Sequence, residues 1–361
     1  MAKRLILLGA TGSIGMSTVD VVRTHPDEFK VVAVSALRSR EKCEAIAKEL
    51  GARAYVGEDA ALRAVEENDA DVCLVATVGM SGLRPTVAAI EKGMDIALAT
   101  KEVMVMAGEL VTALAKRRGV KFLPVDSEHS AIFQCVQGVG GRCAVDKLIL
   151  TASGGPFLDG PADLSSVTVE QALNHPRWKM GPKVTIDSST MMNKGFEVLE
   201  ARWLFDVPVK HIEVVVHPES IVHSLVTFVD GSTMAQLCPP DMRVPIQYAL
   251  SWPDRLPAAR ARLDLAALAK LTFRQPDPVR FPCLRLVKEA CEQGGCATAI
   301  LAAADEWAVD AFLKGQIKYT QIAQTIEETL AKAPQIEMSS LDAVFEANKW
   351  VRETLTSNLK F

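Results

Sequence analysis

The chain has 361 residues, of which 49% are hydrophobic and 23% charged, a composition typical of a globular protein with roughly two or three domains. A net charge of −4 argues against nucleic acid as the main partner, and no apolar run is long enough to cross a membrane. The eight cysteines include no CxxC pair, so we expect reduced thiols and a cytoplasmic location rather than disulfides or a zinc site.

The chain opens with the pattern of a nucleotide-binding turn. Residues Arg4–Leu8 predict a buried strand, the sequence G-A-T-G-S-I-G follows at 9–15, and a helix begins after it. Strand, glycine turn and helix in this order place a dinucleotide pyrophosphate at the start of the helix. A second strand, predicted for Lys30–Val34, is followed by Arg38 and Ser39. NADH would favour an acidic residue there, whereas basic and hydroxyl side chains favour the 2′-phosphate of NADPH.

Strand and helix patterns alternate as far as residue 125, which predicts a doubly wound parallel sheet. Further strands are predicted at 54–56, 71–77, 96–99 and 121–125, and helices at 60–67, 83–92 and 110–117. Thr100, Lys101 and Glu102 follow one of these strands, at the sheet edge where open α/β folds bind ligands. Lys101 could contact the ribose beside the nicotinamide, and a solvated lysine in a helix-entry turn is the alternative interpretation.

Acidic residues at two places predict a site for a hard divalent cation. Asp126 and Glu128 follow the apolar run Phe122–Val125, and in an extended strand end residues two apart point to the same side. Glu197 and Glu200 lie on a predicted helix beside its apolar stripe. Carboxylates without a cysteine or histidine pair suit Mg²⁺ or Mn²⁺. Ordinary surface acids are the alternative.

Two polar segments predict an anion site. The turn Ser153–Gly155 follows a strand predicted at Leu148–Thr151 and exposes backbone N–H groups that can hold an anion. Hydroxyl, amide and ammonium groups gather at 188–194, which we expect at the start of the helix that carries Glu197, where the helix dipole favours negative charge. A phosphorylated substrate fits this pattern, and plain N-capping is the alternative for the hydroxyl groups.

After residue 150 the pattern changes to a second sheet and then to helices. A strand is predicted at 211–216 and a hairpin at 224–237 with an Asp230-Gly231 turn, whose outer face could pair with another chain. Helices are predicted at 284–292, 298–313, 319–331 and 341–355.

The fold class is therefore α/β, with an N-terminal Rossmann-like doubly wound parallel sheet, a second α+β catalytic domain with its own sheet, and a C-terminal helical bundle. We expect these three parts at 1–122, 123–251 and 283–361, with a linker at 252–282.

The chain resembles the 1-deoxy-D-xylulose 5-phosphate reductoisomerase family in the motifs G-A-T-G-S-I-G, P-V-D-S-E-H, S-G-G-P-F, H-P-R-W-K-M-G, D-S-S-T-M-M-N-K-G-F-E and H-P-E-S-I-V-H, in that family's order. The likeness covers essentially the full chain and includes A-A-A-D-E in the C-terminal helices. It implies isomerisation of 1-deoxy-D-xylulose 5-phosphate and reduction by NADPH to 2-C-methyl-D-erythritol 4-phosphate, an early committed step of the non-mevalonate isoprenoid route. It also implies a divalent cation (Mg²⁺, Mn²⁺ or Co²⁺) and a homodimer, and it leaves open a retro-aldol or an α-ketol rearrangement.

The resemblance also assigns residues, position by position. The metal ligands are Asp126, Glu128 and Glu197. The catalytic residues are Glu128, Lys194, His175 and Glu200. The substrate-binding residues are Ser127, Glu128, Ser153, His175, Trp178, Ser188, Asn193, Lys194, Glu197 and His223. The cofactor-binding residues are Gly9, Thr11, Gly12, Ser13, Ile14, Ala36, Leu37, Arg38, Ser39, Thr100, Lys101, Glu102, Gly181 and Met242.

The family's mobile flap corresponds to the segment with His175, Trp178 and Met180, and its basic neighbours suit a lid over an anion. These neighbours are Arg177, Lys179 and Lys183. The chain departs from the family pattern at four places. Leu37 stands in place of a small residue and Thr100 stands where asparagine is frequent, which puts detailed cofactor contacts in doubt. The segment between Val56 and Asp71 is shorter than in longer family members, and Cys238-Pro239-Pro240 replaces a glycine-bearing turn before Met242.

Two other classes of function stay open at this point. An aspartate-semialdehyde-type dehydrogenase shares the glycine-rich opening and requires a catalytic cysteine, for which Cys135 is the candidate. An NADP-sensing binding protein would keep the glycine turn and show no turnover, and its carboxylates would then have no purpose.

Overall fold

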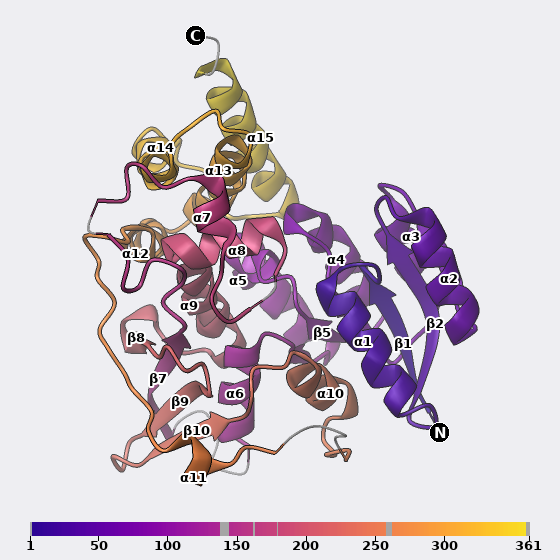
Figure 1. Cartoon of the computed structure of the whole chain (residues 1–361). Helices are drawn as coiled ribbons and strands as arrows, with labels where there is room; N and C mark the ends of the chain where they lie inside the picture. The colour runs from indigo at the N-terminus through magenta and orange to yellow at the C-terminus, as the bar shows by residue number, and fades with distance from the viewer. Residues whose placement is uncertain (1, 138–143, 162, 179, 258–261, 359–361) are drawn as a thin grey trace. The chain divides into compact units, whose positions relative to one another are not determined.

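The computed structural model describes residues 2–137, 144–161, 163–178, 180–257 and 262–358 (Figure 1). The chain forms two compact units. The first unit is Met1–Val103, Val111–Gln137 and Asp241–Leu263. The second unit is Met104–Leu110, Gly138–Pro240 and Asp264–Phe361. Lys179 of the predicted flap lies outside the described residues.

The first unit contains a six-stranded parallel sheet in the order β3-β2-β1-β4-β5-β6. Its strands are β1 (Lys3–Leu8), β2 (Phe29–Ala36), β3 (Arg53–Val56), β4 (Val72–Val75), β5 (Asp95–Leu98) and β6 (Phe122–Pro124). The helical elements of this unit are α1 (Ser13–Thr24), α2 (Arg40–Leu50), α3 (Ala60–Glu66), η1 (Gly79–Gly82), α4 (Leu83–Glu91), α6 (Ser127–Cys135) and α10 (Arg243–Ser251). The strand order reverses between β1 and β4, so the predicted doubly wound sheet is confirmed.

The core of the first unit explains why the sequences of its strands are continuous apolar runs. Both faces of a doubly wound sheet are covered, so β1 is buried from Leu5 to Leu8. The helix α10 returns to this unit after the second sheet, and its Ile246, Ala249 and Leu250 are fully buried in the same core. Neither α10 nor α6 was predicted from the sequence, and both pack against β6.

The second unit contains a four-stranded mixed sheet in the order β10-β9-β7-β8. Its strands are β7 (Val145–Ala152), β8 (Ile212–Val216), β9 (Val222–Phe228) and β10 (Thr233–Leu237). The strand β7 is parallel to β8 and antiparallel to β9. The predicted hairpin of β9 and β10 is confirmed, and Gly231 in its turn has a φ of 85° that glycine adopts without strain.

The described residues of the second unit also form helices. They are α7 (Val169–Leu173), α8 (Pro182–Thr190), α9 (Met192–Phe205), η3 (Val209–His211), α11 (Leu265–Leu268), α12 (Cys283–Gln293), α13 (Ala297–Leu313), α14 (Tyr319–Ala331) and α15 (Leu341–Asn358). The last four form the predicted bundle, with the alanine-rich α13 packed against the other three. Among the described residues, no helix combines the length and apolarity needed to cross a bilayer.

The helix α5 (Glu102–Arg118) contributes to both units, because its residues Met104–Leu110 belong to the second. Ala107 interrupts the helical backbone with a φ of −142°. At Gly108 a methyl group would lie 2.1 Å from the Trp203 ring of α9, so only glycine permits this close packing.

Candidate active site

The turn between β1 and α1 has the geometry of a pyrophosphate cradle. Gly9 has a φ of 82°, and a methyl group on it would lie 2.2 Å from the carbonyl oxygen of Ala76, which follows β4. The helix α1 begins at Ser13, and its N-cap Gly12 offers no side chain to bond the first N–H groups. Those N–H groups are therefore available to an anion at the positive end of the helix dipole. Both Gly12 and Ser13 are exposed, and their neighbours Thr11 and Ile14 are half-buried.

The end of β2 presents side chains that suit a second phosphate. Ala36 is buried, so only its backbone can reach a ligand, whereas Leu37 is 56% exposed. Arg38 and Ser39 are also exposed, immediately before α2. A guanidinium group and a hydroxyl group at this point match the 2′-phosphate of NADPH.

The ends of β5 and β6 bring a lysine and two carboxylates together. Lys101 Nζ lies 2.8 Å from a carboxylate oxygen of Asp126, and both side chains are largely buried, at 12% and 13% exposed. Lys101 is therefore not a solvated lysine. The neighbouring Thr100 donates its hydroxyl hydrogen to the carbonyl oxygen of Thr77 at 2.7 Å, which ties the ends of β4 and β5 together. Glu102 begins α5.

Asp126 and Glu128 are close together because Asp126 caps α6. The extended strand end predicted for these two residues is wrong, because β6 ends at Pro124 and α6 begins at Ser127. A carboxylate oxygen of Asp126 accepts the backbone N–H of Glu128 at 3.1 Å. One oxygen of each carboxylate lies within 4.8 Å of the other, and the Ser127 hydroxyl donates to Glu128. Carboxylate oxygens at this spacing suit a hard divalent cation.

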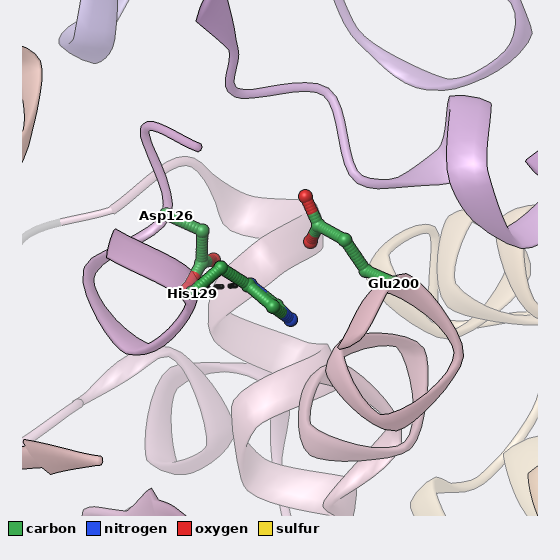
Figure 2. A group of neighbouring side chains, drawn as sticks. All are labelled: Asp126, His129 and Glu200. Carbon is green, nitrogen blue, oxygen red and sulfur yellow. Dashed lines mark ion pairs between the residues drawn. The ribbon is translucent and has the colours of Figure 1, made fainter. Parts of the chain in front are cut away.

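His129 is a residue of this site to which the sequence analysis assigns no role. It is fully buried, and its Nδ1 lies 3.4 Å from Asp126 Oδ1, the same oxygen that accepts the Glu128 N–H (Figure 2). It follows Asp126 by one helical turn, a relation that is visible only once 127–135 is known to be a helix.

The helix α9 holds two buried acids, so they are not ordinary surface acids. Glu197 is 1% exposed and Glu200, drawn in Figure 2, is 0% exposed. Glu197 forms an ion pair with Lys194 and accepts a hydrogen bond from the Asn193 amide at 2.6 Å. A buried carboxylate requires such partners or a cation, because burial alone makes its charge very costly.

The hydroxyl groups of 188–190 are not at the start of this helix, contrary to the sequence-based expectation. Ser188 lies in the last turn of α8, and Met191, with a φ of 64°, separates α8 from α9. The first turn of α9 therefore contains Asn193 and Lys194 but not Ser188.

His175 joins Ser153 and Ser188 into one polar cluster in the second unit. Its Nε2 lies 3.1 Å from the hydroxyl oxygen of each serine. Its Nδ1 accepts the backbone N–H groups of Arg177 and Trp178 at 3.1 and 3.0 Å. Burial lowers the pKa of His175, so the ring is neutral near pH 7 and carries its hydrogen on Nε2.

Backbone geometry brings the Ser153 turn and α8 close together. Gly154 and Gly155 have φ values of 86° and 65°. A methyl group on Gly155 would lie 2.9 Å from the carbonyl oxygen of Ser188, so glycine is needed for this approach. The cluster of Ser153, His175 and Ser188 can present a hydroxyl or N–H donor to an anion.

The remaining predicted residues take separate positions. His223 on β9 is 3% exposed, and its Nε2 lies 3.1 Å from the carbonyl oxygen of Cys238. Trp178 is half-buried, and Gly181 is the N-cap of α8. Met242 packs against the core of the first unit.

Cys135 does not have the properties of a nucleophile. It is 4% exposed on α6, and burial raises the pKa of its thiol to about 11. A reactive cysteine requires a lowered pKa and access to substrate, so the thiol-based alternative has no support here.

Sequence models of one family match most of the chain. The model described as 1-deoxy-D-xylulose 5-phosphate reductoisomerase matches residues 5–54 and 41–108. The models described as its C-terminal domain and as DXP reductoisomerase C-terminal domain match 122–205 and 237–354.

Individual proteins of that description are similar over their whole length. The 1-deoxy-D-xylulose 5-phosphate reductoisomerase of Pseudomonas putida (strain W619) is 48% identical, with 97% of this chain and 96% of the relative covered. That of Caldanaerobacter subterraneus subsp. tengcongensis is 48% identical, with 98% of each covered. The solved structure of the 1-deoxy-D-xylulose 5-phosphate reductoisomerase from Zymomonas mobilis in complex with NADPH has a TM-score of 0.92 at 38% identity, with 100% of both chains covered. A DOX-P reductoisomerase in complex with NADPH, fosmidomycin and magnesium has a TM-score of 0.93 at 38% identity, covering 99% of this chain and 98% of that one.

Proposed function

The chain belongs to the 1-deoxy-D-xylulose 5-phosphate reductoisomerase family, and on that premise we propose how its residues divide the work of the reaction. The enzyme isomerises 1-deoxy-D-xylulose 5-phosphate and reduces the product with NADPH, using a divalent cation, to 2-C-methyl-D-erythritol 4-phosphate. One observation carries the assignment of residues: the Asp126 and Glu128 carboxylates lie at the carboxyl edge of the same parallel sheet whose β1–α1 turn suits a dinucleotide.

We assign the cation to Asp126 and Glu128 of the first unit and Glu197 of the second. The donor set supports this, since three carboxylates offer only hard oxygen ligands. The ion pairs of these carboxylates also support it. Lys101 pairs with Asp126 and Lys194 pairs with Glu197, so both carboxylates already lie next to positive charge, as they would next to a metal ion. When bound, the cation supplies Lewis-acid polarisation of the substrate's carbonyl oxygen.

The substrate's phosphate group is assigned to the second unit. Ser153 and Ser188 offer hydroxyl groups, and neutral His175 offers an Nε2–H between them. Asn193 and Lys194 add donors in the first turn of α9, at the positive end of its dipole. Binding energy from this remote group positions the reacting carbons.

Several catalytic assignments concern groups close to these sites. The Lys194 ammonium group can neutralise negative charge on the substrate, and Glu200, one turn after Glu197, adds negative charge that favours a cation. Ser127 holds Glu128 by a hydrogen bond. His223 and Trp178 are proposed to contact the substrate, with Trp178 in a flap that excludes water.

NADPH is assigned to the first unit's sheet edge, where it supplies hydride for the reduction. The pyrophosphate is placed on Gly9, Gly12 and the first turn of α1, which includes Ser13 and Ile14, with Thr11 beside it. Arg38 and Ser39 are assigned to the 2′-phosphate, with Ala36 and Leu37 next to them. The assignments of Thr100, Lys101, Glu102, Gly181 and Met242 to the cofactor stay proposals.

We also propose a homodimer and a cytoplasmic location. The strand β10 is at the edge of its sheet, and Met234 on it and Val229 before it are 44% and 70% exposed. An exposed edge strand can pair with a second copy of the chain. The described cysteines are free, which suits a reducing compartment.

The experiment that tests this function is NADPH oxidation with 1-deoxy-D-xylulose 5-phosphate, followed with and without a chelator. We expect turnover that the chelator abolishes and that Mg²⁺ or Mn²⁺ restores. Turnover that persists in the chelator would contradict the cation assignment, and absence of turnover under all conditions would contradict the function.

A further inference from the structure

A buried ion cluster lies in the second unit, apart from the residues assigned to cation, substrate and cofactor. Lys183, in the first turn of α8, places its ammonium group 2.5 Å from Asp187 and in contact with Asp305 of α13. Asp305 is 0% exposed and belongs to the A-A-A-D-E motif. The ammonium group also lies 4.8 Å from the centre of the Phe196 ring on α9. The ammonium group of Lys183 thus contacts α8, α9 and the helical bundle.

Burial of these charges costs free energy, so we expect the cluster to position the helices rather than to stabilise the fold. Two carboxylates and one ammonium group lose most of their contact with water, and apolar residues of similar volume often give equal or greater stability. Charge-assisted hydrogen bonds are short and directional, so this cluster restricts the distance between the elements that carry it. The elements fixed here are the start of α8 and the middle of α13.

A second tether joins the other end of α8 to the same bundle. The Tyr319 hydroxyl of α14 donates to the carbonyl oxygen of Ser189 at 2.7 Å. Tyr319 is buried between Phe157 and Phe312, with ring centres 5.3 and 5.8 Å away. Its position is therefore fixed by packing on both sides. Both ends of α8 are attached to helices of the bundle.

The last turn of α8 carries Ser188, which contacts His175 at 3.1 Å. The carbonyl oxygen of Ser188 also borders Gly155, in the turn that carries Ser153. A shift of α8 along or across its axis would change both contacts. The distance between the Ser188 hydroxyl and His175 Nε2 thus depends on the two tethers.

We infer that Asp305 and Tyr319 are positioning residues, which hold α8 in the place where Ser188, His175 and Ser153 can bind the substrate's phosphate group together. This gives the C-terminal helical bundle a part in substrate affinity, although none of its residues is assigned to the substrate. The inference rests on the proposed phosphate site and goes beyond it.

The test compares Asp305→Asn, Tyr319→Phe and the matched control Asp310→Asn in the full-length enzyme. Asp310 is on the same helix as Asp305 and pairs with Lys314 at the surface, both side chains being about 60% exposed. We expect Asp305→Asn to raise the KM for 1-deoxy-D-xylulose 5-phosphate about tenfold, the effect of losing one charge-assisted contact. Tyr319→Phe should raise it about threefold, since a neutral hydrogen bond is worth less. The Kd for NADPH of both tether variants, and every kinetic and binding constant of Asp310→Asn, should stay within about twofold of the parent value.

The outcomes separate the inference from the proposed function. An unchanged substrate KM in both tether variants would overturn the inference, and so would an equal loss of NADPH affinity, which indicates general loosening. Tyr319→Phe removes one hydroxyl group only, so it tests the inference even if Asp305→Asn does not fold. Failure of the proposed function is seen separately, as absence of chelator-sensitive turnover in the parent enzyme.

Discussion

Replacing Glu197 by glutamine should abolish most turnover while NADPH binding persists. The change keeps the size of the side chain and removes its negative charge. Glu197 is 1% exposed and bonded to Lys194 and Asn193, so water cannot take the place of the lost carboxylate. Lewis-acid polarisation is worth several kcal/mol, and each ~1.4 kcal/mol is a tenfold change in rate. We therefore expect kcat to fall by about 10²–10³.

The same change weakens the charge-assisted contact with Lys194, which costs about 1.5–3 kcal/mol of folding stability. Loss of turnover must therefore be separated from loss of structure. NADPH binding, followed by its fluorescence, reports on the first unit, which does not contain Glu197. The matched control is Glu213→Gln, because Glu213 on β8 is a half-exposed carboxylate paired with Lys147.

The assay is NADPH oxidation over a range of Mg²⁺ concentrations with saturating substrate. Glu197→Gln should show a low kcat and need more Mg²⁺ for half-maximal rate, whereas Glu213→Gln should match the parent. A Glu197→Gln enzyme that binds NADPH and turns over within about threefold of the parent rate would refute the assignment of Glu197 to the cation.

Three further outcomes are expected. Arg38→Ala should lower NADPH affinity about tenfold and leave NADH affinity unchanged, because only NADPH carries the 2′-phosphate; equal effects on the two cofactors in a binding titration would contradict this. The pKa of His175 is lowered from 6.5, so the folded state binds fewer protons than the unfolded state as pH falls below about 6.5. The free energy of unfolding should therefore decrease in that range, and urea unfolding should show a smaller decrease for His175→Gln. Cys135→Ser should keep parent turnover and thiol alkylation of the native enzyme should not inhibit it, whereas loss of activity in the serine variant would revive the thiol-based mechanism.

The fold was predictable where local pattern and tertiary structure agree. The run Leu5–Leu8 is apolar because both faces of its sheet are covered, and glycine at position 9 is required by the approach of Ala76. The hairpin of the second sheet followed from an Asp-Gly turn between alternating strands. These signals lie within a few residues of one another in the sequence.

The site was predictable in composition and less so in geometry. The carboxylates were found, but the cap at Asp126 was taken for strand alternation, since both patterns place residues two apart close together. The break at Met191 had no sequence signal, because a left-handed backbone is usual for glycine and not for methionine. The contact of Lys183 with Asp305 joins residues 122 positions apart, which no local pattern reveals.

The division of the chain by function into 1–122, 123–251 and 283–361, with a linker at 252–282, stays a prediction. The helix α10 belongs to the core of the first unit although it follows the second sheet. Apolar periodicity identifies a helix with a buried face but does not say which core buries it.

The central claim is that one divalent cation, held by Asp126, Glu128 and Glu197, lies beside the nicotinamide. It is tested most directly by the relaxation of nicotinamide protons in a complex of the enzyme with NADP⁺, substrate and paramagnetic Mn²⁺. We predict strong enhancement of relaxation in the parent enzyme that Mg²⁺ reverses and that Asp126→Asn abolishes. Nicotinamide protons that relax at the same rate with Mn²⁺ and with Mg²⁺ would contradict the claim.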